Sequence, residues 1–130
     1  MCIFCKIIKG EVSCGKIYED EHVLVFLDIE PINKGHCLVI TKKHYETLLE
    51  IPENEFSYLF SALKRVGGAL MNGLKAEGFN IGMNNFSVAG QVVMHAHFHV
   101  IPRFKGDGLK HWPGKKFEDG EYIEEIKRFL

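Results

Sequence analysis

Three histidines alternate with apolar residues in the segment His95-Ala96-His97-Phe98-His99-Val100-Ile101. In an extended strand, successive side chains point to opposite faces of the sheet. The pattern therefore predicts a strand that carries three imidazoles on one face, roughly 7 Å apart, with Ala96, Phe98 and Val100 packed on the other face. A chain with such a strand must bury one face of its sheet and keep the other for chemistry.

Two other interpretations of the three histidines are open at this point. A strand with a solvated face can carry histidines that have no function, although three at every second position are harder to explain in this way. Neutral imidazole is also the commonest metal ligand among side chains. A metal-binding role therefore stays open for one of the three.

The composition predicts a single domain, over residues 1–130, with one buried core. Sixteen basic and seventeen acidic residues give a formal net charge of -1. This balance creates no overall field that would attract nucleic acid or an anionic membrane, so any recognition of phosphate must be local. The N-terminus lacks a signal peptide's apolar run, and no stretch approaches the ~20 apolar residues of a membrane span. We expect a soluble cytoplasmic protein.

Four cysteines in a reducing compartment do not imply disulfides, and Cys2-x-x-Cys5 is then more typical of a metal-binding or redox-active pair. The redox interpretation is weak because no thioredoxin-like βαβ pattern surrounds the pair. Cys37 lies in an apolar strand and is expected in the core. Cys14, in a Ser-Cys-Gly loop, is expected to be a free thiol.

The order of apolar segments and turns predicts an α+β fold. Three strands precede the long helix, whose apolar residues recur at helical spacing, while Gly67-Gly68 within it should weaken or crowd the packing. A loop over residues 85–94 should lie beside the triad, and residues 105–120, with four glycines and Pro113, should be extended or mobile. The expected strands are 16–18, 23–29, 35–41, 79–84 and 95–102; the expected helices are 3–9, 53–74 and 121–130; and the expected apolar stripe of the long helix is Phe56, Leu59, Phe60, Leu63, Val66, Leu70 and Leu74.

The residues around the triad closely resemble a known family. Ala89-Gly90-Gln91 precedes it, His95 to Ile101 follows a His-φ-His-φ-His-φ-φ pattern, and Pro102-Arg103 comes after. Together with the segments named at the end of this paragraph, over about residues 1–105, they resemble the histidine triad (HIT) superfamily of nucleotide hydrolases and transferases. The further segments are Cys2-Ile3-Phe4-Cys5-Lys6-Ile7-Ile8, Tyr18-Glu19-Asp20-Glu21-His22, Phe26-Leu27-Asp28-Ile29, Gly35-His36-Cys37-Leu38-Val39-Ile40 and Lys42-Lys43-His44.

The resemblance implies an antiparallel sheet of about five strands with one long helix, a short N-terminal helix and a C-terminal helix. It also implies a homodimer in which two sheets join by two-fold symmetry.

The resemblance assigns the nucleophile to the middle histidine, His97. Neutral imidazole can act as a nucleophile near pH 7, and histidine forms covalent intermediates. His97 would attack the α-phosphorus to form a nucleotidyl-histidine, which water cleaves to a nucleoside monophosphate. Its other ring nitrogen should donate to an acceptor, such as a backbone carbonyl, to fix the reactive tautomer.

The same resemblance implies three further catalytic residues. His99 would contact the phosphate beside the bond that breaks, and His36 would contact the phosphate or the leaving group. An ordinary histidine at the start of a strand is the alternative for His36. Gln91 has a flexible amide that could contact a bridging oxygen and position the water of the second step.

The resemblance also implies a set of residues that bind a purine nucleotide. Asp28 would accept hydrogen bonds from the ribose hydroxyls, and Gly90 would let the backbone approach the phosphate because it has no side chain. Val92 stands where many relatives have Ser or Thr, so a hydroxyl donor is missing and the preference for a leaving group is in doubt. The base would lie among Phe4, Ile7, Phe26 and Ile29, for which plain core packing is the alternative, and Asn84 would lie near the ribose and phosphate.

In a zinc-containing, prokaryotic branch of the superfamily, a Cys-x-x-Cys pair joins the first triad histidine and a histidine after the third strand. Cys2, Cys5, His44 and His95 occupy all four positions here. Two thiolates and two imidazoles form a closed tetrahedral site of the structural kind. The resemblance therefore implies a structural zinc that holds the N-terminal segment against the triad strand, and no organic cofactor.

These inferences favour a hydrolase that acts at the α-phosphate of nucleoside phosphoramidates or dinucleoside polyphosphates. The segment from His99 to Arg103 resembles the polyphosphate and general prokaryotic members, whereas His111-Trp112-Pro113 resembles the phosphoramidase type. A nucleotidyl transferase with a non-water acceptor is the alternative within the same chemistry. A nucleotide-binding regulatory protein with incidental turnover is the alternative of a different class.

Overall fold

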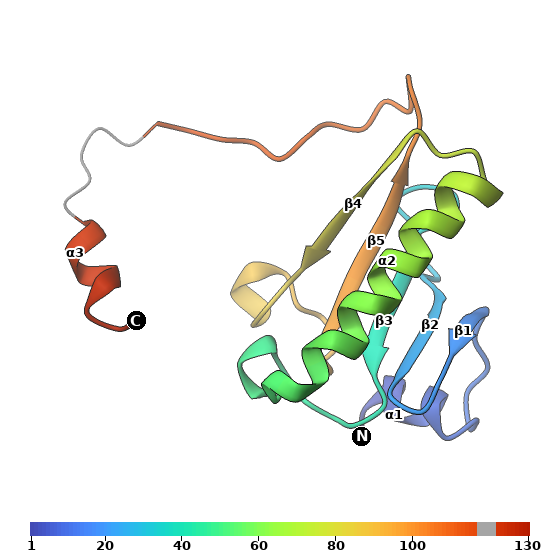
Figure 1. Cartoon of the computed structure of the whole chain (residues 1–130), viewed down its shortest axis with the longest axis horizontal. Helices are drawn as coiled ribbons and strands as arrows, with labels where there is room; N and C mark the ends of the chain where they lie inside the picture. Colours follow the sequence, from blue (N-terminus) through green and yellow to red (C-terminus); the bar gives the residue numbers. More distant parts are fainter. Residues whose placement is uncertain (117–121) are drawn as a thin grey trace.

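A five-stranded antiparallel sheet forms the centre of the molecule, a computed structural model that describes residues 1–116 and 122–130 (Figure 1). The strand order is β1-β2-β3-β5-β4, so the strand with two of the three histidines, β5, lies inside the sheet. This arrangement confirms the predicted α+β fold. The strands are β1 (Lys16–Glu19), β2 (Val23–Leu27), β3 (Cys37–Thr41), β4 (Gly78–Met83) and β5 (His97–Arg103); the helices are α1 (Ile3–Ile8), α2 (Phe56–Gly73) and α3 (Tyr122–Lys127), with single 3-10 turns η1 (Leu48–Glu50), η2 (Glu53–Glu55) and η3 (Ser87–Ala89).

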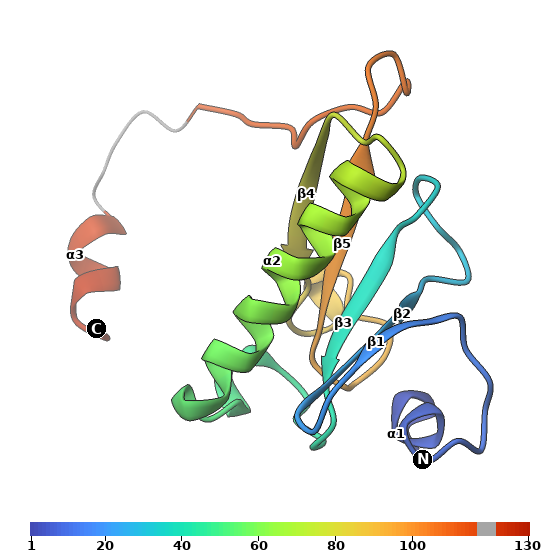
Figure 2. The same cartoon turned by 45° about the vertical axis from the view of Figure 1, so that its right-hand side comes forward.

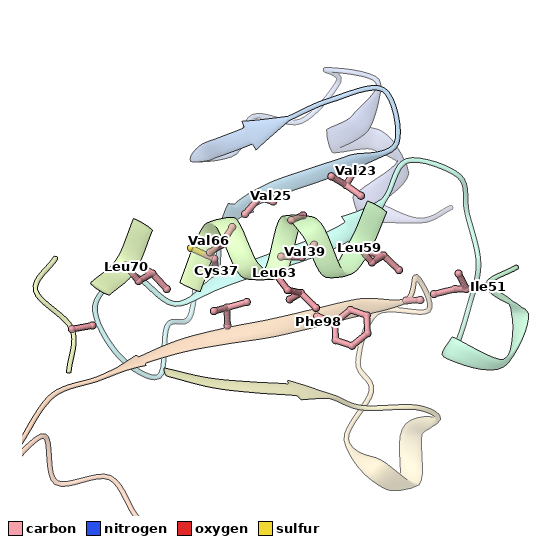
Figure 3. Packing of buried hydrophobic residues seen from close by; sticks show 14 residues of the cluster. Val23, Val25, Cys37, Val39, Ile51, Leu59, Leu63, Val66, Leu70 and Phe98 are labelled. Atoms are coloured by element: carbon pink, nitrogen blue, oxygen red, sulfur yellow. The ribbon is translucent and has the colours of Figure 1, made fainter. Parts of the chain in front are cut away.

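Helix α2 covers one face of the sheet and closes the main core (Figures 1 and 3). Alternate residues of the three central strands point toward α2, as the strand periodicity predicts. Ala96, Phe98 and Val100 all belong to this core, which confirms the packing face of the triad segment. The buried side chains labelled in Figure 3 are Val23, Val25, Cys37, Val39, Ile51, Leu59, Leu63, Val66, Leu70 and Phe98.

Helix α1 lies on the opposite face of the sheet from α2 (Figure 2), where a smaller apolar cluster forms. In the antiparallel pairing of β3 with β5, Leu38 is opposite His99 and Ile40 is opposite His97. Directly opposed residues share a face, so both histidines lie on the face that carries α1. The buried members of this cluster are Phe4, Leu24, Phe26, Leu38 and Ile40.

The predicted start of the triad strand is wrong, because β5 begins at His97 and not at His95. The last residue pair of the β3–β5 ladder is Ile40 with His97, and the chain bends before it. The backbone N–H of Ala96 donates to the carbonyl of Tyr45 at 2.7 Å, outside the sheet. His95 lies outside the ladder, yet its ring still points to the same face as His97, toward Phe4 and the two thiols of the N-terminal segment.

The long helix matches its prediction over most of its length. Its first three predicted residues form η2, and α2 begins at Phe56. Phe60 and Leu74 are exposed, which corrects the predicted apolar stripe. The expected crowding is confirmed at Gly67, where an added Cβ would come within 2.5 Å of the Phe79 ring, whereas Gly68 faces open space.

After β5 the chain leaves the sheet as an extended segment (Figure 1). Residues 104–116, the part of this segment that the structure describes, form neither helix nor strand. As far as residue 116, this agrees with the segment expected over 105–120. The predicted helix over 121–130 is present as Tyr122–Lys127, and residues 128–130 follow it outside the helix. Residue 121, with residues 117–120 of the expected extended segment, lies outside the described residues. Within residues 1–116 and 122–130, none of the helices has the length and apolar character needed to cross a membrane.

Candidate active site and metal centre

The imidazole of His97 is held in one tautomer by the backbone. Its Nδ1 atom lies 2.7 Å from the carbonyl oxygen of His95, and a carbonyl oxygen can only accept. The ring proton is therefore on Nδ1, and Nε2 keeps its lone pair. The ring is buried, and the Phe4 ring contacts it edge-to-face at a centroid distance of 5.2 Å. In the neutral ring, Nε2 of His97 is thus an unprotonated nitrogen whose orientation is fixed by the backbone.

His36 and His99 form a hydrogen-bonded pair whose direction follows from a backbone donor. The N–H of Ile32 donates to Nδ1 of His36 at 3.0 Å, so the proton of the neutral His36 ring is on Nε2. His36 Nε2 lies 2.9 Å from His99 Nδ1 and donates to it. His99 consequently carries its own proton on Nε2, where it can donate a hydrogen bond to an anionic ligand.

The carboxylate of Asp28 completes this group. Its Oδ2 atom lies 3.6 Å from His36 Nε2 and 3.9 Å from His99 Nδ1. Three such groups could hold a metal ion, but His36 Nε2 carries a proton in the tautomer described above and cannot be a ligand. Asp28 therefore lies beside the hydrogen-bonded pair of His36 and His99 as a nearby charge, beyond hydrogen-bond distance of either ring.

Burial keeps His36 and His99 neutral at pH 7. It lowers the pKa of His36, although Asp28 opposes the shift. Burial, together with the neighbouring His97 and His36, lowers the pKa of His99 to about 4. Both residues are therefore hydrogen-bonding groups with defined directions rather than cations.

Four ligand atoms from distant parts of the chain converge beside the start of β5. His44 Nδ1 lies 3.2 Å from His95 Nδ1 and 3.3 Å from Cys5 Sγ. His95 Nδ1 lies 3.5 Å from Cys2 Sγ and 3.6 Å from Cys5 Sγ. A tetrahedral zinc ion with bonds of about 2.0 Å to nitrogen and 2.3 Å to sulfur places neighbouring ligand atoms about 3.3 to 3.8 Å apart. These residues therefore fit a Cys₂His₂ metal site.

A backbone acceptor orients His95 for this role. The Nε2 atom of His95 lies 2.8 Å from the carbonyl oxygen of Thr41, so Nε2 carries the proton and Nδ1 presents its lone pair to the cluster. Burial lowers the pKa of His95 to about 4, which keeps the ring neutral as a ligand must be. Cys2 also caps α1 by accepting the N–H of Cys5 at 3.4 Å, so the two thiols stand on the first turn of that helix.

Gln91 is held by backbone groups in this structure. The residue is only 3% exposed, and its Oε1 atom accepts the N–H of Phe86 at 2.7 Å. Its Nε2 atom donates to the carbonyls of Glu46 at 2.6 Å and Val93 at 3.0 Å. The amide thus joins the loop over residues 85–94 to the chain after His44, and the predicted contact with phosphate would require it to exchange one of these three backbone partners.

The residues expected to surround the base differ in their burial and packing. Phe4 and Phe26 are buried and contact each other at 5.3 Å, which supports the core interpretation, although Phe4 also contacts His97. Ile7 packs against the same cluster, whereas Ile29 lies beyond the end of β2 and is 94% exposed. Ile29 is therefore no part of the apolar cluster.

The loop residues fall on two sides of the triad. The amide of Asn84 donates to the carbonyl of Gly90 at 3.3 Å, and Gly90 adopts a φ of 96°, a conformation that favours glycine. Val92 is exposed and lines a shallow groove with Met1 and His44. Val92 therefore lies on the side of the metal cluster.

A cleft of about 950 Å³ opens beside His99, on the β4 side of the sheet. Ile101 and Asn84 line it from the sheet and the adjoining loop. Lys110, His111 and Trp112 line it from the extended C-terminal segment. A ligand that reaches His99 can therefore extend into this cleft.

Two features of the site have little or no signal in the sequence. The carbonyl of Thr41, which orients His95, is a backbone group that no residue type identifies. The Arg103 guanidinium donates to both carboxylate oxygens of Asp107, at 2.8 and 3.0 Å, and holds the pKa of that carboxyl well below its usual range. The spacing of these two residues by four positions is a weak signal for this pair.

The fold, the three histidines and their backbone partners define a histidine-triad protein. The sequence profile of the HIT domain family matches residues 9–106. The chain belongs to the HIT family.

Relatives and solved structures agree with this assignment. The uncharacterised HIT-like protein MJ0866 of Methanocaldococcus jannaschii is 50% identical over 129 residues, which are 98% of this chain and 99% of the relative. The structure of SMU.412c from Streptococcus mutans is similar with a TM-score of 0.91 at 41% identity, over 98% of this chain and 84% of that one. A zinc-bound histidine triad protein of Mycobacterium smegmatis has a TM-score of 0.80 at 37% identity, over 98% and 91% of the two chains.

Two relatives carry names that state an activity. The adenosine 5'-monophosphoramidase HNT1 of Candida albicans is 42% identical over 106 residues, which are 78% of this chain and 70% of that protein. The adenylylsulfatase HINT3 of Arabidopsis thaliana is 43% identical over 108 residues, which are 83% of this chain and 55% of that protein. Named hydrolases that act on nucleotides are thus among the relatives of this chain.

Proposed function

We propose that this protein is a nucleotide hydrolase that cleaves at the α-phosphate through a nucleotidyl intermediate on His97. The observation that carries the proposal is the hydrogen bond from His97 Nδ1 to the His95 carbonyl, which leaves Nε2 as a neutral nucleophile. The names of the phosphoramidase and adenylylsulfatase relatives support the same reaction class.

The reaction has two balanced steps. The Nε2 lone pair of His97 forms a bond to the α-phosphorus, and the bond from phosphorus to the leaving nitrogen or oxygen breaks as that group takes up a proton from solvent. Water then adds to phosphorus and gives up a proton to solvent, the bond from phosphorus to nitrogen breaks and returns its electron pair to Nε2, and a nucleoside monophosphate is released. In both steps, the Nε2–H of His99 would donate to a phosphate oxygen as negative charge develops.

The remaining residues would hold the substrate. A purine nucleotide would place its ribose hydroxyls against Asp28, with the base along the edge of the cluster formed by Phe4, Ile7 and Phe26. The leaving group would enter the cleft beside His99, whose wall includes Asn84.

The test is release of AMP from an adenosine 5'-phosphoramidate and, separately, from a diadenosine polyphosphate. The wild-type protein and His97→Gly are compared at equal concentration, with nucleotide affinity measured for both. Release that disappears in His97→Gly while AMP still binds supports the proposal, and the preferred compound assigns the leaving group. Equal release by the two proteins, or none from either compound, contradicts it.

We further propose that the Cys₂His₂ cluster binds a structural zinc ion. The ligand geometry and the zinc-bound relative support this assignment. The four ligands leave no open position for water, so the ion would supply structural cohesion, not chemistry. Cys2 and Cys5 would anchor α1, and with it Phe4, to the start of the triad strand through His95 and His44.

A homodimer is part of this proposal. The edge strand β4 presents unpaired backbone groups, and apolar side chains on β4 and on the neighbouring α2 are exposed, among them Phe60, Phe79 and Ile81. Light scattering at micromolar concentration should give twice the monomer mass. A cytoplasmic location also stays a prediction, which the four unpaired cysteines favour.

A further inference from the structure

The carboxylate of Asp107 joins separate parts of the chain where β5 ends. Oδ1 accepts from the Arg103 guanidinium and from the N–H of Leu109, both at 3.0 Å. Oδ2 accepts from Arg103 Nε at 2.8 Å and from the N–H of Phe104 at 3.1 Å. Oδ2 also accepts from the side-chain amide of Asn33 at 3.2 Å. Asn33 lies 74 positions earlier in the sequence, so this last bond reaches a different part of the molecule.

Asn33 belongs to the turn that presents His36 to the site. The same Asn33 amide donates to the carbonyl of Pro102 at 3.0 Å, and its backbone carbonyl accepts the N–H of His36 at 3.0 Å. Its neighbour Ile32 supplies the N–H that bonds Nδ1 of His36 and so decides which nitrogen of that ring carries the proton. The position of this turn therefore controls the direction of the hydrogen bond from His36 to His99.

We propose that Asp107 is a positioning residue of the active site, which acts through Asn33 on the tautomer and position of His36. With the turn anchored, Ile32 donates to His36 Nδ1, and His36 in turn donates to His99. With the turn released, the Ile32 bond loosens, His36 can take the other tautomer, and the bond to His99 loses its donor. The expected effect on kcat rests on the proposed function, whereas the expected effect on the tautomer of His36 does not.

The hydrogen bonds of Arg103 allow the positioning role of Asp107 to be tested separately from a general effect on protein stability. Arg103 also donates to Asn80 at 2.9 Å and to the carbonyl of Leu109 at 3.0 Å, so the end of β5 keeps contacts that do not involve Asn33. Asn33→Ala therefore breaks the connection to the turn while it leaves the pair of Arg103 and Asp107 in place. Asp107→Asn weakens the pair itself and keeps the size of the side chain.

A control variant is available in the same region. Glu77 accepts the N–H of Lys105 at 2.8 Å and thus also anchors the segment after β5, but it has no hydrogen bond to the turn that carries Asn33. Glu77→Ala removes a hydrogen bond of the same kind and should leave His36 unchanged.

The experiment measures the ring nitrogens of His36 by long-range proton–nitrogen NMR in ¹⁵N-labelled, full-length protein at neutral pH. In the wild type and in Glu77→Ala, Nδ1 of His36 should have the shift of an unprotonated nitrogen and Nε2 that of a protonated one. In Asn33→Ala and Asp107→Asn, the two shifts should move toward each other as the tautomers mix. Thermal unfolding of each variant shows whether it is folded. Because Asn33→Ala also removes the bond to the Pro102 carbonyl, the role of Asp107 itself is decided by Asp107→Asn, or by Asp107→Ser if Asp107→Asn is not folded, and unchanged His36 shifts in that folded variant also overturn the inference.

Kinetics provide the second measurement. With the substrate that releases AMP, Asn33→Ala should lower kcat roughly 10- to 100-fold with little change in KM, as expected when a reacting group is misplaced. Unchanged His36 shifts in a folded Asn33→Ala variant overturn the inference, whatever the activity. Changed shifts in a protein that hydrolyses none of the nucleotides would instead contradict the proposed function and retain the positioning role.

Discussion

The Nδ1 atom of His97 donates to the carbonyl oxygen of His95, two residues earlier, at 2.7 Å. This contact connects the proposed nucleophile to a proposed metal ligand through the backbone of one residue. His95 uses its ring for the metal cluster and its carbonyl for His97. Because the β3–β5 ladder ends at His97, the carbonyl of His95 is not used for strand pairing there and can accept from His97.

The first prediction concerns the covalent intermediate. Wild-type protein, mixed briefly with an adenosine 5'-phosphoramidate and quenched in denaturant at alkaline pH, where a bond from phosphorus to histidine nitrogen survives, should gain the mass of one adenylyl group on the peptide that contains His97. His97→Gly should gain none, and its turnover should fall by about 10³-fold or more, because loss of a nucleophile removes the whole covalent route. An adduct on another residue would reject His97 as the nucleophile.

Metal content gives the second prediction. The purified protein should contain about one zinc ion per chain, and Cys5→Ser should contain less than half of that. Binding to the folded state alone should stabilise the wild type by about 4 kcal/mol when free zinc exceeds its Kd roughly 1,000-fold. Cys14→Ser is the matched control, since Cys14 lies outside the cluster and should keep full zinc content.

Elemental analysis and urea unfolding, with and without a chelator, provide both measurements. Intact folding and unchanged stability of the wild-type protein after complete removal of metal would contradict a structural role.

The third prediction is a pH dependence of stability that originates in His99. Its pKa is about 4 in the folded protein, against an ordinary value of 6.5. Between these values the unfolded chain binds the proton more strongly, so the free energy of unfolding should fall as the pH decreases from about 6.5 to 4. His36, whose pKa is also lowered by burial, contributes in the same direction.

His99→Gln should therefore lose stability less steeply than the wild type over this range. Urea unfolding at pH 7, 6 and 5 measures the difference, and parallel curves for the two proteins would exclude a buried neutral His99.

Gln91 provides a fourth prediction that separates the expected role from the observed one. Gln91→Glu places an acceptor against the carbonyls of Glu46 and Val93, so it should lower the free energy of unfolding by about 1–3 kcal/mol. The exposed neighbour Val92 serves as control, and Val92→Thr should stay within about 0.5 kcal/mol of the wild type. A large loss of kcat in Gln91→Glu at unchanged stability would instead support the predicted role of Gln91 in positioning water.

The fifth prediction compares two adjacent glycines of α2. Gly68→Ala should stabilise the protein by about 0.5–1 kcal/mol, because the added methyl meets open space and alanine favours the helix. Gly67→Ala gains the same helix propensity but forces the Phe79 ring on β4 to move, so it should be less stable than Gly68→Ala by about 1–3 kcal/mol. Thermal unfolding of both variants tests this, and equal stabilities would show that Phe79 turns away at no cost.

Much of this site could be predicted from residue types and spacing. The alternation of His97, Phe98, His99 and Val100 predicted which face of β5 packs against α2, because a strand's side-chain period is two. The strand order along the chain and the long amphipathic helix followed from periodicity in the same way. Phe60 was wrongly predicted to be buried, because the sheet covers a narrower stripe of α2 than the one that includes Phe60.

The sequence by itself determined the chemical groups of this protein: the triad, the extra histidine His36 and a set of two thiols and two imidazoles. Only the tertiary structure decided how these groups are used. The protons of His97, His95 and His36 are placed by backbone partners, the carbonyls of His95 and Thr41 and the N–H of Ile32, and backbone groups are the same in every residue. Their positions depend on where strands end and turns close, which long-range pairing decides and local residue patterns do not.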